Sequence, residues 1–217
     1  MGDISTPMKP DPKTLRRAVE HLRGADPVMA RLIDSVGRCR YAVEHGGGPF
    51  ASLAEAIVYQ QITGKAAETI YARVRALIGR RHPRAQDIAA VTDAELRAAG
   101  LSRQKIGYLR DLSARAEAGL PLSRLSRHDD ERVAATLTQV KGIGRWTAHM
   151  FLMFRLGRLD VLPVDDYGIR KSMQRAYGFR ALPKPDRMLK VAAPWRPYRS
   201  VAAWYLWRSL DARVEGT

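Results

Sequence analysis

The sequence has one cysteine, Cys39, among its 217 residues. A disulfide within the chain needs two cysteines, and a zinc or iron–sulfur site built from four thiolates needs four, so both are excluded. No apolar run approaches the length of a membrane span, and residues 1–12 are polar and rich in proline, unlike a signal peptide. These absences predict a cytoplasmic protein that does not bind a membrane, and they exclude cofactors that need thiolate ligands. No cofactor is expected.

The alternating pattern typical of β-strands is also absent, whereas apolar residues recur at helical spacing along most of the chain. The sequence therefore predicts an all-α fold. A chain of this length can bury one sizeable core or two small subdomains that pack closely together. We expect residues 1–10 to be a disordered lead and residues 11–217 to form one compact unit.

Negative charge is scarce, since 22 Asp and Glu stand against 37 Lys and Arg and leave a formal net charge of +15. Such an excess is the electrostatic signature of a protein that binds a polyanion. An arginine-rich composition taken from a biased genome is the alternative explanation. Charge alone favours a polyanionic partner without identifying it.

Two predicted helices are joined by a short turn that contains Gly142 and Gly144. Asp129 and Asp130 are typical N-cap residues, and apolar residues follow them at helical spacing. A second, largely buried helix is predicted over residues 145–156. Glycines adopt backbone angles that other residues avoid, and they let a phosphate approach the amides at the start of the next helix. The turn is therefore a candidate phosphate-binding hairpin.

Two carboxylates, Asp165 and Asp166, stand before Tyr167 at the predicted start of a third helix. The order of helix, Lys-Gly-Ile-Gly hairpin, helix and Asp-Asp pair resembles the helix-hairpin-helix superfamily of DNA glycosylases. Gly-Ile-Gly-Arg-Trp-Thr-Ala (142–148) and Leu-Pro-Val-Asp-Asp-Tyr (162–167) resemble its 3-methyladenine DNA glycosylase II branch. The resemblance extends from about residue 50 to residue 210, and the first two helices are placed by analogy.

The resemblance implies a compact helical glycosylase fold with two helical subdomains that flank a DNA-binding cleft. The hairpin motif would occupy about residues 131–157, and the helices within residues 11–45 would pack together with residues 158–217. A single-domain form is expected, because the bacterial enzyme's additional N-terminal sheet domain has no counterpart in this sequence. The implied partner is double-stranded DNA with alkylated bases, bound by a monomer at the nucleoid.

The implied reaction is hydrolysis of the N-glycosidic bond of an alkylated purine such as 3-methyladenine. The nucleotide must first leave the stack, which costs roughly a few kcal/mol and least for a damaged base. By resemblance Asp166 is the catalytic carboxylate, and Asp165 is the competing assignment. We expect Asp166 to be only partly desolvated until DNA binds. The alternative is that both aspartates merely cap a helix.

Trp146 and Trp207 are the main candidates for the base pocket, and Tyr59 is a third. Stacking contributes ~1–3 kcal/mol per base, and a cationic methylated purine would gain a further ~0.5–2 kcal/mol from cation–π attraction. Core packing is the alternative interpretation of all three side chains. Met150 stands where the bacterial enzyme II has an aromatic residue, which leaves the breadth of the lesion range open.

Other residues are expected to contact the duplex. By position, Gln61 is the candidate wedge that enters the duplex gap, with Ile62 next; the alternative is that Gln61 only binds backbone at a helix end. The residues expected at phosphate are Lys141, Gly142, Ile143, Gly144 and Arg145. The hairpin carbonyls resemble a site that holds a monovalent cation in the family, and no other metal is expected.

The helix predicted after Ser102 is basic and amphipathic. Its charged side chains Arg103, Lys105 and Arg110 could touch phosphate, although a run of charges is usually a solvated face. The choice between the two interpretations is left open by the sequence.

The sequence favours a monofunctional enzyme. In the endonuclease III-type branch a Schiff-base lysine directly follows Gly-x-Gly-x, and Trp146 holds that position here, while Lys141 precedes the glycines. Two alternatives remain: a bifunctional glycosylase/lyase for oxidised bases, and a non-catalytic helix-hairpin-helix DNA-binding protein. The pair of Asp165 and Asp166 argues against the second, because carboxylates beside DNA are unfavourable unless they do chemistry.

Overall fold

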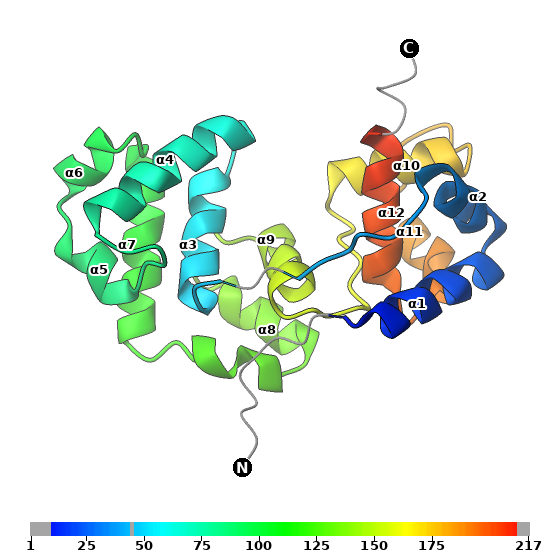
Figure 1. Cartoon of the computed structure of the whole chain (residues 1–217), viewed down its shortest axis with the longest axis horizontal. Coiled ribbons are helices and arrows are strands. Elements are labelled where there is room, and N and C mark those ends of the chain that lie inside the picture. The colour runs from blue at the N-terminus through cyan, green and yellow to red at the C-terminus, as the bar shows by residue number, and fades with distance from the viewer. Residues whose placement is uncertain (1–9, 44–45, 212–217) are drawn as a thin grey trace. The chain divides into compact units, whose positions relative to one another are not determined.

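A computed structural model describes residues 10–43 and 46–211 of the chain (Figure 1). These described residues contain helices and no β-strand, which confirms the predicted all-α fold. The α-helices are α1 (Pro12–Ala25), α2 (Pro27–Val36), α3 (Pro49–Tyr59), α4 (Gly64–Leu77), α5 (Ala85–Ala90), α6 (Asp93–Ala98), α7 (Arg103–Glu117), α8 (Asp130–Leu137), α9 (Arg145–Met150), α10 (Tyr167–Ala176), α11 (Pro185–Val191) and α12 (Arg199–Asp211). Two short 3-10 helices, Leu122–Arg127 and Ala193–Trp195, and a π-helical turn, Phe151–Arg155, lie between them.

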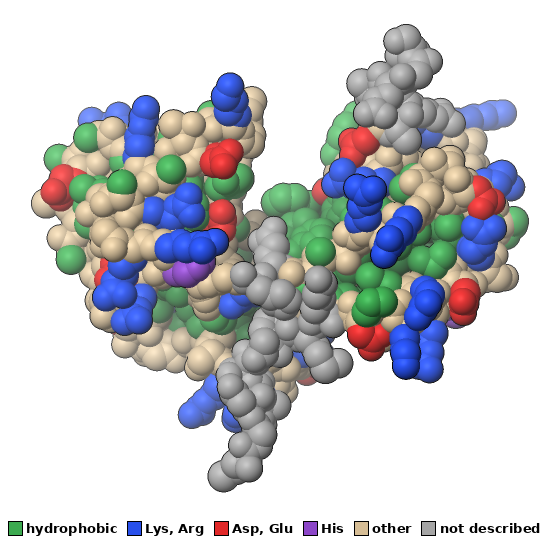
Figure 2. Space-filling model, viewed as in Figure 1, with side chains coloured by type: hydrophobic (Ala, Val, Ile, Leu, Met, Phe, Trp, Pro, Cys, Tyr) green, Lys and Arg blue, Asp and Glu red, His purple; other side chains and the backbone are tan. Residues whose placement is uncertain are grey.

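The helices fall into two compact units. Helices α3 to α9 form the first, called the hairpin unit (residues 46–151). Helices α1 and α2 join α10, α11 and α12 in the second, called the terminal unit (residues 10–43 and 152–211). Figure 1 shows α1 and α2, in blue, beside α12, in red, so the two ends of the sequence share one core. Lys and Arg side chains are spread over the visible surface of both units (Figure 2).

Helix α7 is central to the hairpin unit, where it packs against α3, α5 and α6. Ser102 caps it by accepting a hydrogen bond from the Lys105 amide. The apolar face of this amphipathic helix, Ile106, Leu109 and Leu112, is buried. Burying three such side chains contributes very roughly 1.5–3 kcal/mol each, so this face is a main source of stability in the unit.

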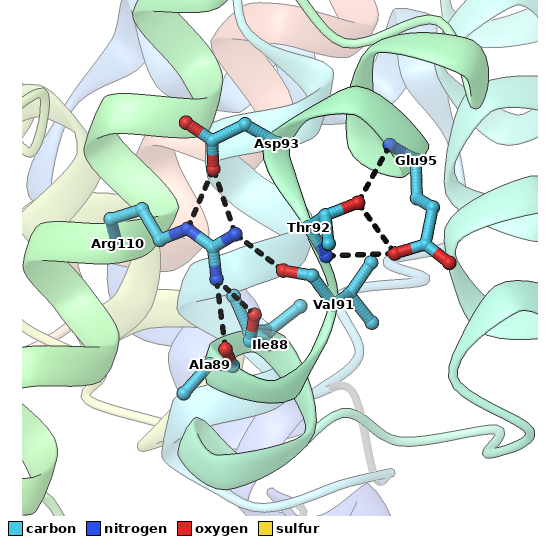
Figure 3. Close-up of polar contacts among 7 residues, drawn as sticks. All are labelled: Ile88, Ala89, Val91, Thr92, Asp93, Glu95 and Arg110. Carbon is cyan, nitrogen blue, oxygen red and sulfur yellow. Dashed lines mark hydrogen bonds and ion pairs between the residues drawn. The ribbon is translucent and has the colours of Figure 1, made fainter.

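The guanidinium of Arg110 on α7 is used within the protein (Figure 3). It donates to the carbonyl oxygens of Ile88, Ala89 and Val91, and it holds Asp93 Oδ1 at 2.7 and 3.0 Å. Arg110 thereby ties the end of α5 and the start of α6 to α7. The expectation that Arg110 could contact phosphate is not supported, because its donors already have partners.

Helix α12 is the core helix of the terminal unit, and it packs against α1, α2 and α10. Its residues Val201–Leu206 are buried. A second anchor is Asp26, which precedes α2 and is 7% exposed. Its Oδ1 accepts the amides of Val28 and Met29, and its Oδ2 accepts the Tyr177 hydroxyl at 2.5 Å and the Trp195 indole at 2.9 Å.

The structure differs from the sequence-based expectation in three places. The predicted helix over residues 145–156 is α-helical only to Met150 and then widens into a π-helical turn, which apolar spacing alone cannot distinguish from an α-helix. Two short helices, α5 and α11, were not expected. Of the predicted disordered lead, residues 1–9 lie outside the described residues.

No helix among the described residues is long and apolar enough to span a membrane.

Candidate active site

The hairpin joins α8 to α9 and contains two glycines. Its geometry requires glycine at position 142 but not at position 144. Val140 and Ile143 are buried, so their side chains anchor the turn in the core. Gly142 has a φ of 81°, and a Cβ atom there would lie 2.2 Å from the ring of Tyr108. Gly144 is different, since its φ is −90° and a Cβ atom there would meet nothing within 4 Å. The surface at Gly144 is thus open for a group that approaches the backbone.

Two of the five residues expected at phosphate have their amides occupied by the protein. The Lys141 amide donates to Asp111 Oδ2 at 2.8 Å, and the Ile143 amide donates to the Val140 carbonyl at 3.1 Å. The Ile143 side chain is also buried, so this residue acts as an anchor of the turn. Lys141 can reach phosphate only with its side chain.

The remaining hairpin candidates are Gly142, Gly144 and Arg145. Arg145 begins α9, is exposed, and forms an ion pair with Glu131 at 2.7 Å. Both partners are largely exposed, so the pair contributes little and a phosphate can compete for the guanidinium. Trp146 follows Arg145 with 44% of its surface exposed. A large aromatic ring left so exposed beside the hairpin is unlike a core side chain.

The wedge corner is the connection between α3 and α4, residues 60–63. Gln61 has a φ of 57°, and it is the one non-glycine residue with a positive φ within residues 10–43 and 46–211. Strained backbone of this kind tends to occur at functional sites and needs the surroundings to hold it. Gln61 and Ile62 are both exposed at this corner, as a wedge requires.

A cavity of about 550 Å³ lies between the wedge corner and the hairpin. Its wall includes Tyr59, Gln60 and Gln61 from the corner, Lys105 and Tyr108 from α7, and Gly142, Trp146 and Met150 from the hairpin motif. A cavity of this size with aromatic walls and a few polar groups is typical of a site for a small ligand. The hairpin unit therefore brings together Tyr59, Trp146 and the candidate wedge residue.

Asp166 lies in the terminal unit and caps α10. Its Oδ1 accepts the Ile169 amide at 2.8 Å and the Trp207 indole N–H at 2.9 Å. The residue is 9% exposed, so it is more buried than expected, because the helix start and the indole ring cover it. Asp165 is exposed. The two aspartates thus differ in burial, and Asp166 is the one that caps α10 and accepts the Trp207 indole, while its catalytic role stays a prediction.

Trp207 is half-buried and packs against a row of aromatic rings. Its ring centroid is 5.9 Å from that of Phe154, and Phe154 is 5.6 Å from Tyr41. The Tyr41 hydroxyl donates to the Met153 carbonyl at 2.6 Å, and burial raises its pKa, so this hydroxyl stays protonated. The row fixes the indole plane, and with it the hydrogen bond to Asp166.

Gly168 preserves the space between the two key side chains of the terminal unit. A Cβ atom at this position would lie 3.1 Å from Asp166 Oδ1 and 3.2 Å from Trp207 Cδ1. Such contacts are tighter than a side chain normally makes, so glycine here keeps the carboxylate and the indole at hydrogen-bonding distance.

The site residues named from the sequence fall into two groups. Asp166 and Trp207 meet in the terminal unit, whereas Trp146, Tyr59, the wedge corner and the hairpin lie in the hairpin unit. A common pocket of Trp146 and Trp207, and a cleft between the units, stay predictions. The other two tryptophans, Trp195 and Trp204, are buried. Lys105, Tyr108 and Gln60 were not expected to line a cavity, because nothing in their local sequence marks a long-range contact.

Metal ligands are not concentrated in the part of the chain that the structure describes, where His, Cys, Asp and Glu form no group of three or more suited to a metal ion. The predicted monovalent cation would instead use hairpin carbonyls. One of these, the Gly142 carbonyl, accepts the Gln60 side-chain amide at 2.8 Å. A cation at the hairpin therefore stays a prediction that must rely on the other carbonyls.

Residues 54–197 match the model of the HhH-GPD superfamily base excision DNA repair proteins. The chain belongs to this family. It is 34% identical to DNA-3-methyladenine glycosylase 1 of Schizosaccharomyces pombe over 90% of this chain and 88% of that protein. A putative DNA-3-methyladenine glycosylase of Bacillus subtilis is 32% identical, over 77% of this chain and 63% of that protein.

Two solved structures are similar over nearly their whole length. The S. pombe 3-methyladenine DNA glycosylase Mag1 in complex with abasic DNA has a TM-score of 0.77, with 34% identity over 88% of this chain and 95% of that one. A DNA-3-methyladenine glycosidase of Bacillus halodurans has a TM-score of 0.81, with 35% identity over 92% and 91% of the two chains. The helical glycosylase fold and the branch inferred from the hairpin motif are thereby confirmed.

Proposed function

We propose that this protein is a monofunctional DNA glycosylase that releases alkylated purines, such as 3-methyladenine, from double-stranded DNA. The observation that carries the proposal is Asp166, a buried carboxylate held by a helix start and by the Trp207 indole. The hairpin and the wedge corner supply the means to bind the duplex. The names of the similar glycosylases support the same substrate class.

The reaction breaks the bond between the base nitrogen and the anomeric carbon. The leaving base takes the bonding electrons, and a base that was cationic through alkylation leaves neutral, so it needs no general acid. The sugar meanwhile gains positive charge. Asp166 would stabilise that charge or take a proton from the attacking water, and either role lowers the barrier. The products are the free base and an abasic site.

Selection of the lesion would come from aromatic rings rather than from hydrogen bonds to base edges. Trp146 is exposed enough to stack on a flipped base, and Trp207 lies directly at the carboxylate. Cation–π attraction favours a positively charged purine by ~0.5–2 kcal/mol, which is comparable with the cost of flipping. We therefore place the distinction between alkylated and normal purines in these rings.

The bifunctional alternative needs a lysine amine at the position of Trp146. An indole cannot form a Schiff base, so the chain has no nucleophile at that point of the hairpin motif. The solved 8-oxoguanine glycosylase/lyase of Clostridium acetobutylicum is 16% identical with a TM-score of 0.73, which indicates a shared fold alone. We also propose that the protein acts as a monomer on the nucleoid in the cytoplasm.

One assay tests the proposal against both alternatives. Duplexes that carry 3-methyladenine, 7-methylguanine or 8-oxoguanine are incubated with the protein, and strand breaks are measured before and after alkali, with borohydride in a parallel tube. We expect release of the alkylated purines ahead of 8-oxoguanine, breaks only after alkali, and no trapped adduct. Breaks without alkali together with an adduct would establish a lyase. Tight binding without release of any base would leave a DNA-binding protein.

A further inference from the structure

One face of α7 holds both the end of α3 and the hairpin. Lys105 Nζ donates to the Val58 carbonyl at 2.7 Å, and Asp111 Oδ2 accepts the Lys141 amide at 2.8 Å. Between them, Tyr108 packs against Gly142 so closely that a Cβ atom there would clash with its ring. Residues 105, 108 and 111 are spaced by three and so share a helix face. The end of α3, which leads into the wedge corner, and the hairpin are therefore both held by α7.

Gln60 makes the direct connection between these two loops. Its side-chain amide donates to the Gly142 carbonyl at 2.8 Å, across 82 residues of sequence. The residue is half-buried in the wall of the cavity, where water competes less for this bond than at an open surface. Gln60 also ends α3, and the next residue is Gln61 with its positive φ. The hydrogen bond thus fixes Gln60, the residue directly before the strained backbone of Gln61.

We propose that Gln60 is a positioning residue, which locks the wedge corner to the hairpin so that Gln61 stands at a set distance from the bound phosphate. This inference rests on the proposed function. Gln60 donates to protein backbone, so it acts through Gln61 and the hairpin. When the hairpin holds the phosphate, the hydrogen bond from the Gln60 side chain to the Gly142 carbonyl keeps the wedge aligned with the duplex gap. Loss of the bond should therefore weaken flipping and leave the chemical step unchanged.

The test uses Gln60→Met in the full chain, because Met keeps the length and packing of Gln but has no N–H donor. Release of 7-methylguanine is measured in single turnover from a paired duplex and from the same strand with the lesion in an unpaired bubble. A second readout is the fluorescence of 2-aminopurine beside an abasic site, which reports opening of the stack without any cleavage. Gln174→Met is the matched control, since Gln174 also donates its amide to a carbonyl, that of Arg180.

We expect Gln60→Met to release base from the duplex about three- to tenfold more slowly, the factor that loss of one hydrogen bond corresponds to. Release from the bubble should stay within about twofold of the unsubstituted chain, and the 2-aminopurine signal should fall. Gln174→Met should match the unsubstituted chain in all three. Equal rates on the duplex, or equal losses on duplex and bubble, would overturn the inference.

Two further measurements separate this inference from other failures. If Gln60→Met lowers the melting temperature strongly, Gln60→Glu is used in its place. The Glu side chain is polar like that of Gln, but its carboxylate has no N–H to donate to the Gly142 carbonyl. Gln60→Glu should also release base more slowly from the duplex only. Slower release from both the duplex and the bubble would count against a positioning role. If the unsubstituted chain releases no alkylated base, the proposed function fails, while the 2-aminopurine signal on abasic DNA still decides the role of Gln60.

Discussion

Asp26 and Asp166 lie in the same unit and begin their helices in similar ways. Each caps a helix with Oδ1, and each accepts an indole N–H at 2.9 Å, from Trp195 and Trp207 respectively. Their exposed fractions, 7% and 9%, are too close to tell them apart. The partners differ, because Trp195 is fully buried whereas Trp207 is only half-buried.

The side chains that donate to the two carboxylates also differ. Asp26 receives two backbone amides on Oδ1 and the Tyr177 hydroxyl and Trp195 indole on Oδ2, so both oxygens serve the fold. Asp166 accepts the Ile169 amide and the Trp207 indole on Oδ1, so its ring partner is a side chain that reaches the surface. The comparison teaches that capping and burial alone do not distinguish a structural N-cap aspartate from a catalytic candidate, whereas the partner ring does: Trp195 is buried in the core and Trp207 reaches the surface.

The largest expected effect comes from Asp166→Asn, which removes the negative charge and keeps the shape. Release of alkylated purine should fall by about 10²–10⁴, the range typical of a catalytic acid or base, while binding to lesion DNA is retained. Single-turnover release and a binding titration measure the two quantities. Asp165→Asn, at an exposed position, is the control and should be near normal. The opposite result for the two variants would make Asp165 the catalytic residue.

Asp26→Ala should act on stability instead. It leaves the half-buried Tyr177 hydroxyl and the buried Trp195 indole without their acceptor, and the unfolding free energy should fall by about 3 kcal/mol. Urea denaturation of the full chain measures this loss, and the folded fraction should release base at the normal single-turnover rate. A variant that keeps its stability and loses activity would erase the distinction between the two aspartates.

The pH dependence of stability follows from Asp26. Burial raises the pKa of this carboxyl, but the hydroxyl, indole and two amide donors together outweigh it, so the pKa lies below its usual 3.8. The folded state then binds fewer protons than the unfolded state, and the stabilisation is complete above about pH 4 and lost as the pH falls through the folded pKa. We expect the stability gap between the natural chain and Asp26→Asn to narrow as the pH is lowered from about 5 to about 3. A gap that stays constant over this range would count against the assignment.

Trp207→Phe and Trp195→Phe form a matched pair, because each keeps a ring and removes the indole donor to an aspartate. Trp207→Phe should slow base release by about tenfold, the effect of losing ~1.4 kcal/mol of a hydrogen bond to a charged group. Trp195→Phe should lower the unfolding free energy by about 1–2 kcal/mol and leave release unchanged. Single-turnover release and urea denaturation of both variants give the comparison, which fails if the two respond alike.

The smallest expected effect concerns the hairpin. Binding should weaken steeply with salt as phosphate contacts release counterions, and Arg145→Gln should reduce the slope of log affinity against log salt by about one. Arg208→Gln is the control, since Arg208 is equally exposed and equally paired, to Asp211, but lies on α12. A slope near zero in the natural chain would remove the phosphate model.

Much of the local structure follows from the sequence. Ser102 begins a helix where expected, and the hairpin glycines stand between two helices. The π-helical turn at Phe151–Arg155 was missed, because its apolar residues fit an α-helical period equally well. The roles of Lys105 and Arg110 were also open, because a basic side chain on an amphipathic helix gives no sign of whether its partner is phosphate or a carbonyl of the same protein.

The sequence by itself determined the helical class, the hairpin with its two glycines, and the pair of aspartates that starts α10. These features depend on caps, turns and apolar spacing, whose energies arise within a few residues. Tertiary structure alone decided that Gln60 reaches Gly142 and that the Trp207 indole donates to Asp166. These partners are 82 and 41 residues apart, so their contacts exist only after the helices have packed, and no local pattern records which side chains that packing brings together.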